Sequence, residues 1–360
     1  MTQKVLVGMS GGVDSAVAAS SLIDQGYEVI GATLLLWQGD YENKKENGKT
    51  CCSIDDVEDA RSVANKLDIP FYVLNMKELF EEKVVDYFTA SYFMGTTPNP
   101  CIACNRYIKF EAMLDKALAL GADFIATGHY ARIEFDEKTG RYLLKKAVDV
   151  SKDQSYVLYM LTQPQLKRLI LPLGNMVKTD TRKEALDKGL RVSSKPDSQD
   201  ICFVEGGKYG DFIKKYTNKE APHGWFVDRK GSRLGKHKGI VNYTIGQRKG
   251  LGISASAPLY VIEKNIKENT VVLGFKDETY TKSFTASEMN FIAFDEPTKA
   301  FHAMAKVRYS AKESEAVVTP IGENRVKVEF LRPQPFVAPG QAVVLYDGDL
   351  VIGGGTIDEI

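Results

Sequence analysis

A short glycine-rich stretch near the start of the chain, Gly8 to Ser15 (GMSGGVDS), carries residue types that suit phosphate binding. Adjacent glycines let backbone N–H groups face an anion without a Cβ atom in the way, and a helix that begins there adds partial positive charge. The spacing differs from G-x-x-x-x-G-K-[ST], since no lysine lies within the stretch, and also from G-x-G-x-x-G. It therefore predicts a nucleotide-phosphate site of another kind.

The cysteines are the second group of residues suited to chemistry. There are five, Cys51, Cys52, Cys101, Cys104 and Cys202. An odd number is not typical of a disulfide framework, so structural, catalytic and metal-binding roles all stay open. Cys104 is expected just ahead of a helix that includes Lys109 and Phe110. Because a helix start favours the thiolate form, this placement favours a reactive Cys104.

These residues must be positioned by elements that alternate between strand and helix. Apolar runs at 4–7, 28–36, 70–74 and 123–127 predict strands, and periodic apolar positions predict helices after the glycine stretch and at 55–67, 79–93 and 109–120. This alternation predicts an α/β fold, a doubly wound parallel sheet with helices on both faces. Ligands of such sheets bind at the carboxyl ends of the strands, where the glycine stretch, Leu34 and Thr127–Tyr130 are expected.

The pattern of predicted strands and helices changes in the rest of the chain. A hairpin is predicted over 132–146 and helices over 156–161 and 181–188, after which the alternation of strand and helix stops. A glycine-rich segment then predicts a small second domain, and six short strand-like runs from about residue 281 predict an antiparallel β-barrel. The predicted division is 1–203 for the nucleotide-binding domain, 204–280 for the small basic domain and 281–360 for the barrel.

Charge is balanced overall but uneven locally. The chain has 47 Lys and Arg against 47 Asp and Glu, yet residues 206–250 hold eleven cations and three acids. A local net charge of +8 favours a polyanion such as a nucleic acid, although an ordinary solvated face would look the same. The composition is that of a soluble globular protein, and no stretch reads as a leader or a membrane span. We expect a cytoplasmic protein that contacts no membrane.

The glycine stretch and four further motifs carry a resemblance. Ser10–Ser15 (SGGVDS) resembles the PP-loop of ATP pyrophosphatases, in which the loop holds the pyrophosphate that leaves when AMP is transferred. Together with TPNPCIACN at 97–105, ATGHYA at 126–131, KDQSY at 152–156 and KPDSQDICF at 195–203, it resembles the tRNA-specific 2-thiouridylases, the MnmA family. The resemblance covers nearly the whole chain.

The resemblance implies a function and a set of residues. The family uses ATP to activate C2 of the wobble uridine, position 34, in tRNAs for Lys, Glu and Gln, and replaces its oxygen with sulfur from a cysteine desulfurase or a sulfur-relay protein. It implies ATP contacts at Gly8, Met9, Ser10, Gly11, Gly12, Val13, Asp14, Ser15, Leu34 and Gly128, with Asp14 near Mg²⁺. It implies tRNA contacts at Asn99, Pro100, Cys101, His129, Lys152, Asp153, Gln154, Arg308, Tyr309 and Gln341.

The sulfur chemistry admits two arrangements. By resemblance, Cys202 carries a persulfide and Cys104 is the nucleophile that forms a disulfide with it. Many family members have an aspartate where this chain has Cys101, so Cys101 has no required role in that scheme. The alternative is a [4Fe–4S] cluster on Cys101, Cys104 and Cys202, with a fourth iron left to hold sulfide.

Two other classes of function stay open on the sequence. One is a different PP-loop ligase, such as an amidotransferase-type synthetase or argininosuccinate synthase, which adenylates a small molecule. The other is a non-catalytic, RNA-binding nucleotide sensor. The ligase needs neither the pair of distant cysteines nor the basic middle segment, and the intact glycine stretch and the two cysteines count against the sensor. AMP release that depends on tRNA distinguishes the thiouridylase hypothesis from the first alternative, and detection of thiolated tRNA distinguishes it from the second.

Overall fold

The computed structural model describes residues 2–37, 54–196 and 201–360 of the chain. Its first sheet has five parallel strands in the order β3-β2-β1-β4-β7. These strands are β1 (Lys4–Gly8), β2 (Glu28–Leu35), β3 (Phe71–Asn75), β4 (Phe124–Thr127) and β7 (Leu169–Ile170). The order reverses between β1 and β4, and such a switch point is where open α/β sheets bind their ligands.

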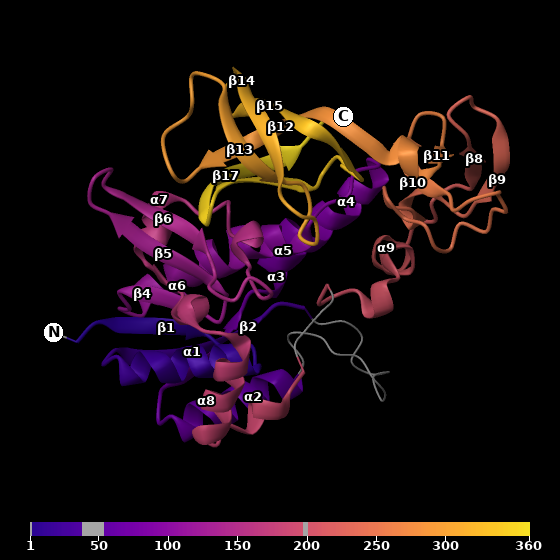
Figure 1. The fold of residues 1–360 in the computed structure, drawn as a ribbon. Coiled ribbons are helices and arrows are strands. Elements are labelled where there is room, and N and C mark those ends of the chain that lie inside the picture. Colours follow the sequence, from indigo (N-terminus) through magenta and orange to yellow (C-terminus); the bar gives the residue numbers. More distant parts are fainter. Residues whose placement is uncertain (1, 38–53, 197–200) are drawn as a thin grey trace.

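Both faces of this sheet are buried. In β1, Leu6 packs on one face, whereas Val5 and Val7 pack on the other, against helix α1 (Val13–Asp24). A strand with both faces covered is apolar throughout, which explains why the sequence shows a run rather than an alternation there. Helices α2 (Ile54–Lys66) and α8 (Lys178–Asp187) lie on the side of α1 (Figure 1). The predicted doubly wound sheet is confirmed.

Two long helical segments lie between the sheet and the C-terminal strands. One is continuous from α3 (Lys77–Phe80) through a π-helical turn to α4 (Tyr87–Phe93). The other runs from α5 (Pro100–Ala103) through a π-helix to α6 (Met113–Ala119). The predicted helix at 109–120 thus begins nine residues early, because Pro100 occupies the first helical position and the Asn99 side chain accepts a hydrogen bond from the Cys101 N–H at 3.1 Å.

The segment that follows the hairpin strands β5 (Ala131–Asp136) and β6 (Arg141–Lys146) differs from the prediction. The helix predicted at 156–161 is wrong, since only a 3₁₀ turn at Ser155–Val157 forms, and the helices here are α7 (Gln163–Lys167) and α8. Residues 158–161 are all buried, and the Tyr156 hydroxyl donates to the Ala342 carbonyl at 2.9 Å. Burial on every side, not helical amphipathicity, accounts for the apolar run.

A mixed four-stranded sheet forms the middle of the chain. After helix α9 (Tyr209–Thr217), its strands are β8 (Gly224–Val227), β9 (Arg233–His237), β10 (Tyr260–Asn265) and β11 (Thr270–Gly274). Their order is β10-β11-β8-β9, so β9 lies at one edge. Phe226, His237 and Tyr243 pack with ring centroids 5.0–5.6 Å apart on the buried face. This sheet lies to one side of the rest of the molecule (Figure 1).

The last strands close into the predicted antiparallel barrel. They are β12 (Tyr280–Phe291), β13 (Phe301–Lys306), β14 (Ser314–Gly322), β15 (Arg325–Pro335), β16 (Ala342–Asp347) and β17 (Leu350–Ile357). The order β12-β15-β14-β13-β16-β17 closes because β12 also pairs with β17. The β5–β6 hairpin adds to the barrel sheet through the pairing of Leu350 with Lys145, which joins a segment that follows β4 to the barrel. That attachment is not evident from the sequence.

Candidate active site

The glycine stretch forms a tight turn between β1 and α1. Gly12 is the N-cap of the helix and makes no side-chain cap, so the first N–H groups of α1 face the carboxyl edge of the sheet. The Ser15 hydroxyl accepts from the Ser10 N–H at 3.1 Å and donates to the Gly12 carbonyl at 3.1 Å. The Ser15 side chain therefore stabilises the turn through hydrogen bonds to two of its backbone groups. The start of a helix behind such a turn suits phosphate, because the first N–H groups of a helix have no partner within it.

Two glycines are required by close packing around this turn. Gly11 has φ +69°, and a Cβ atom on it would lie 2.3 Å from the Asp56 carbonyl oxygen. A Cβ atom on Gly128 would lie 2.7 Å from the Asp14 carbonyl carbon and 2.8 Å from the Ser15 nitrogen. The loop after β4 thus packs directly on the loop after β1. The two elements predicted to bind nucleotide are in contact.

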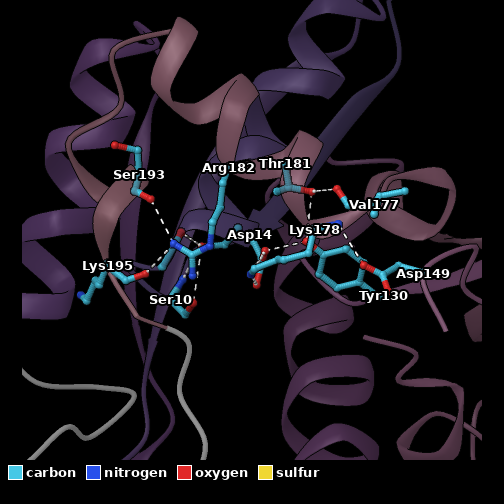
Figure 2. A network of polar contacts seen from close by, with 12 residues as sticks. Ser10, Asp14, Tyr130, Asp149, Val177, Lys178, Thr181, Arg182, Ser193 and Lys195 are labelled. Atoms are coloured by element: carbon cyan, nitrogen blue, oxygen red, sulfur yellow. Dashed lines mark hydrogen bonds and ion pairs between the residues drawn. The ribbon is translucent and has the colours of Figure 1, made fainter. Parts of the chain in front are cut away.

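Asp14 belongs to a polar network that fixes its carboxylate (Figure 2). The Lys178 ammonium lies 2.6 Å and 2.7 Å from its two oxygens, and the Tyr130 hydroxyl donates to Oδ1 at 2.8 Å. Lys178 is 8% exposed and belongs to the first turn of α8, whereas Tyr130 follows β4. Tyr130 also contacts the Thr181 hydroxyl at 3.0 Å. The network brings a buried cation to a loop that has no lysine of its own.

A second set of contacts ties the loop to the segment after α8. The Lys195 ammonium bonds the Gly11 carbonyl at 3.0 Å, Asp56 at 2.7 Å and Asp59 at 2.6 Å. Burial lowers the pKa of Lys195, but its hydrogen bonds to the two aspartates outweigh this and raise it above its ordinary value. Arg182 donates to the Ser193 and Lys195 carbonyls at 3.1 Å and 3.2 Å (Figure 2). Both cations stabilise the wall of the site.

A cleft of about 390 Å³ opens above the loop at the switch point. Of the residues predicted to bind ATP, its lining includes Gly8, Met9, Ser10, Gly12, Val13, Asp14, Ser15, Leu34 and Gly128. Gly11 is absent from the lining because it packs against Asp56 instead. Of the residues predicted to contact tRNA, His129, Lys152, Gln154 and Tyr309 line the same cleft. Residues predicted to bind ATP and residues predicted to contact tRNA therefore line the same cleft.

His129 lies at the end of β4, on the wall of the cleft. It is 9% exposed, and its Nδ1 lies 2.7 Å from the Thr127 hydroxyl. Burial, and next the positive charge of Lys109, hold its pKa well below the ordinary value of 6.5. The imidazole is therefore neutral near pH 7, and it accepts or donates a hydrogen bond without adding charge to the cleft.

The loop that carries Lys152, Asp153 and Gln154 is held by internal hydrogen bonds. The Asp153 carboxylate accepts from the Ala147 N–H at 3.0 Å and the Ser155 hydroxyl at 2.8 Å, and it is 8% exposed. Gln154 accepts from the Tyr130 N–H at 2.9 Å. The Tyr309 hydroxyl donates to the Asp153 carbonyl at 3.1 Å, which connects this loop to the barrel domain. The buried carboxylate organises the loop, and tRNA contact by Asp153 stays a prediction.

The remaining predicted tRNA contacts lie outside this cleft. Asn99 lines a separate pocket of about 260 Å³ between α5 and the barrel, and Pro100 beside it is buried. Gln341 donates to the Thr97 carbonyl at 2.8 Å. The Arg308 guanidinium stacks 5.2 Å from the centre of the Phe336 ring. Asn99 and Gln341 thus place the start of α5 against the barrel, where the two domains meet.

The three described cysteines lie in different environments. Cys101 is exposed in the first turn of α5, Cys104 is 7% exposed, and Cys202 is intermediate. The expectation that Cys104 lies ahead of a helix is wrong, because the helix begins at Pro100 and places Cys104 in its second turn. Cys101, not Cys104, lies at the start of the helix. Cys104 belongs to the large apolar cluster against which Cys202 packs. Cys51 and Cys52 lie outside the described residues.

The positions of the cysteines and of Asp14 can be compared with the two inorganic groups that the sequence predicts, a [4Fe–4S] cluster and Mg²⁺. No three Cys, His, Asp or Glu side chains among residues 2–37, 54–196 and 201–360 are placed to hold a metal ion. This finding gives no support to the alternative of an iron–sulfur cluster on Cys101, Cys104 and Cys202, which stays a prediction. Both oxygens of Asp14 are bound by Lys178, so the carboxylate does not form a magnesium site by itself. Its predicted position near Mg²⁺ stays a prediction.

Four residues of the site have no role predicted from the sequence. Lys109, Tyr130, Lys178 and Lys195 line the cleft. Tyr130 and Lys195 fall within motifs that carry the resemblance, and Lys109 lies four residues after the motif at 97–105, although no role was assigned to any of them. Lys178 has no local signal, since a lysine near the start of a helix is ordinary.

Fold and site together define a PP-loop protein, in which a parallel sheet presents a phosphate-binding turn at its switch point. Family models match the chain in three parts: a tRNA methyl transferase HUP domain over residues 3–206, a tRNA methyl transferase PRC-barrel domain over 210–275, and an aminomethyltransferase beta-barrel domain over 281–357. The boundaries predicted from the sequence, at 203 and 280, stay a prediction.

Curated relatives match over the full length. The tRNA-specific 2-thiouridylase MnmA of Acetivibrio thermocellus is 56% identical over 355 residues, which are 99% of this chain and 99% of the relative. That of Clostridioides difficile is 53% identical over 359 residues, 100% of this chain and 99% of the relative. The chain belongs to the tRNA-specific 2-thiouridylase family. No described helix has the length and apolarity needed to cross a membrane.

Proposed function

We propose that this protein is a tRNA-uridine 2-sulfurtransferase, which uses ATP to convert the wobble uridine at position 34 to 2-thiouridine. The observation that carries the proposal is the shared cleft. The phosphate-binding turn, Leu34 and Gly128 lie in one cavity with His129, Lys152 and Gln154. An enzyme that transfers AMP to a nucleotide of RNA needs the two substrates to meet in this way, since the uracil oxygen must reach the α-phosphate.

The first step activates C2 of the base. The C2 oxygen attacks the α-phosphorus of ATP, the bond to the β-phosphate oxygen breaks, and pyrophosphate leaves. The turn at Ser10–Ser15 binds the β- and γ-phosphates through backbone N–H groups. Lys178, 8% exposed, supplies the cation that stabilises the charge on the leaving pyrophosphate. Mg²⁺ accompanies ATP as its counter-ion, and no step here depends on a metal ligand from this chain.

The second step delivers sulfur. The terminal sulfur of a persulfide on Cys202 attacks C2, and AMP leaves with the original oxygen. The Cys104 thiolate then attacks the Cys202 Sγ, the S–S bond breaks, and the sulfur stays on C2 while a Cys104–Cys202 disulfide forms. A thiol reductant restores both thiols. The pairing follows from the family resemblance, and both cysteines pack on one large apolar cluster. Cys101 takes no part in the scheme.

The proposal includes the partners of the reaction. The RNA substrates are the tRNAs for Lys, Glu and Gln. They are bound by the basic central domain at 204–280 and by Asn99, Pro100, Cys101, His129, Lys152, Asp153, Gln154, Arg308, Tyr309 and Gln341. Because chemistry at C2 requires access to the base, uridine 34 is turned out of its stack. The sulfur donor is a cysteine desulfurase or a sulfur-relay protein. All of these partners meet the enzyme in the cytoplasm.

AMP release distinguishes this function from a PP-loop synthetase. The protein is incubated with radiolabelled ATP, a cysteine desulfurase and cysteine, and with either unmodified tRNA or a mixture of amino acids and small carboxylates. We expect AMP to form only when tRNA is present and a tRNA with cytidine at position 34 to be inactive. AMP release with a small carboxylate and without tRNA would overturn the proposal.

A further inference from the structure

The outer face of the central sheet carries a tryptophan set among cations. Trp225 in β8 lies opposite Lys236 in the neighbouring strand β9. Side chains alternate along a strand, so Phe226 points inward, where it is 1% exposed, and Trp225 points outward and is only half-buried. The Arg233 guanidinium lies 4.4 Å from the centre of the indole ring and the Lys236 ammonium lies 5.4 Å from it.

The charge on this hairpin is available to an outside partner. Between Gly224 and Lys238 there are five cations and one acid, Asp228. Asp228 accepts from the Lys230 and Ser232 N–H groups at 2.9 Å and 2.8 Å, so it shapes the turn. Arg229 pairs with Glu278 at 3.3 Å. Within the described part of the chain, no carboxylate forms an ion pair with Lys230, Arg233, Lys236 or Lys238.

We infer that this surface, the Trp225 face of the β8–β9 hairpin, binds the backbone and an unpaired base of the tRNA. The inference rests on the proposed function and names residues of the central domain that make the contact. Cations without carboxylate partners suit phosphates, and a half-exposed indole offers a flat surface on which a base stacks. An arginine stacked on the ring keeps its guanidinium edge free to bond a phosphate.

The position of the hairpin fits a long partner. Strand β9 is at the end of the sheet, and the hairpin lies at the outer side of the molecule (Figure 1). A tRNA that reaches the catalytic cleft with one loop extends well beyond it. Lysine and arginine on an edge strand also prevent pairing with other chains, which would explain Arg233 and Lys236 alone. That role does not require an outward tryptophan.

Tryptophan fluorescence tests the inference directly. The chain has two tryptophans, Trp37 and Trp225. Trp37 packs against Phe203, Phe212 and Tyr216 with centroids 5.9–6.3 Å away, so Trp37→Phe keeps an aromatic ring there and leaves Trp225 as the reporter. Titration of this variant with an unmodified tRNA transcript should quench its emission in a saturable manner. The quenching should weaken as salt is raised. Bound tRNA with unchanged Trp225 emission overturns the inference.

Variants give a second readout. Arg233→Ala combined with Lys236→Ala should lower the slope of log Kd against log salt by about 1.4–1.8 if each cation meets one phosphate. Trp225→Ala should weaken tRNA binding about fivefold or more through loss of stacking. Lys66→Ala combined with Lys116→Ala removes two exposed cations from α2 and α6 and should leave both quantities unchanged. Circular dichroism confirms that each variant folds.

The outcomes separate this inference from the proposed function. If wild-type protein forms no 2-thiouridine, the proposed function fails. If wild type is active and the hairpin variants bind tRNA as it does, with the same salt slope, the inference is overturned and the cations only protect the strand edge. If the variants lose activity with a protein sulfur donor but keep it with inorganic sulfide, and bind tRNA normally, the surface binds an acidic protein and the inference is likewise overturned.

Discussion

The ammonium group of Lys178 lies 2.6 Å and 2.7 Å from the two carboxylate oxygens of Asp14, although 164 positions separate the two residues in the chain. Asp14 is in the first turn of α1 and Lys178 in the first turn of α8. Their contact places a cation beside the proposed phosphate-binding turn, which contains no lysine or arginine. It also links the N-terminal strand–turn–helix unit to the end of the nucleotide-binding domain.

Replacement of Lys178 by methionine should abolish activation of the base and leave tRNA binding intact. Methionine keeps most of the length of the side chain and removes the charge, so the expected loss in tRNA-dependent AMP release is about 100-fold or more. Lys183→Met, an exposed change on the same helix, is the matched control and should be silent. A loss of tRNA affinity equal to the loss of activity would contradict the separation of the two roles.

Asp14→Ala should abolish adenylation and also destabilise the fold. Without its carboxylate, the buried Lys178 ammonium loses its partner, at a cost of about 1–3 kcal/mol in the free energy of unfolding. The double variant Asp14→Ala/Lys178→Met should recover most of that stability and none of the activity, as measured by urea unfolding and AMP release. If the two single changes add in the double variant, the ion pair has no energetic role.

The proposed sulfur transfer predicts which of the three cysteines are needed for activity. Cys104→Ser and Cys202→Ser should each lose 2-thiouridine formation while still releasing pyrophosphate, because activation of C2 precedes sulfur transfer. Cys101→Ser should retain substantial activity, and the purified protein should work in air with a desulfurase. The measurement is thiolated nucleoside per enzyme, with iron content determined on protein prepared without oxygen. A Cys101→Ser variant as inactive as Cys104→Ser, beside a wild type that holds about four irons, would refute the persulfide scheme.

Neutral His129 should make the fold sensitive to acid. Its pKa is held well below the ordinary 6.5 in the folded state, whereas the unfolded chain takes up the proton near that ordinary value. The unfolded state therefore binds more protons below about pH 6.5, and stability falls as pH is lowered, by up to about 1.4 kcal/mol per pH unit. His129→Asn should show a shallower loss between pH 7 and 5 in urea unfolding. Parallel profiles would mean that His129 is protonated in the folded protein.

Much of the nucleotide site follows from the sequence, because it is local. The strand, glycine turn and helix at 4–24 are contiguous, and the apolar runs mark strands whose carboxyl ends must share one edge. Leu34 and Gly128 fall at that edge for the same reason. The closed barrel is predictable in kind, since its strands are short, evenly spaced and separated by turn residues.

What the sequence could not predict depends on contacts between distant segments. Lys178 is recognised only by its distance from Asp14, and the β5–β6 hairpin joins the barrel only through the pairing of Lys145 with Leu350. The early start of the helix at Pro100 follows from the Asn99 cap, a local signal that a search for apolar periodicity passes over. It changes which thiol lies at the helix end, from Cys104 to Cys101.

The central claim is that one cleft activates uridine 34 of tRNA and receives sulfur there. Its most direct test is incubation of the wild-type protein with ATP, a cysteine desulfurase, cysteine and unmodified tRNA, followed by digestion and mass analysis of the nucleosides. The account predicts one 2-thiouridine per tRNA, confined to position 34, with one AMP released for each and none formed when ATP is omitted. Unthiolated tRNA beside AMP formed without tRNA would contradict it.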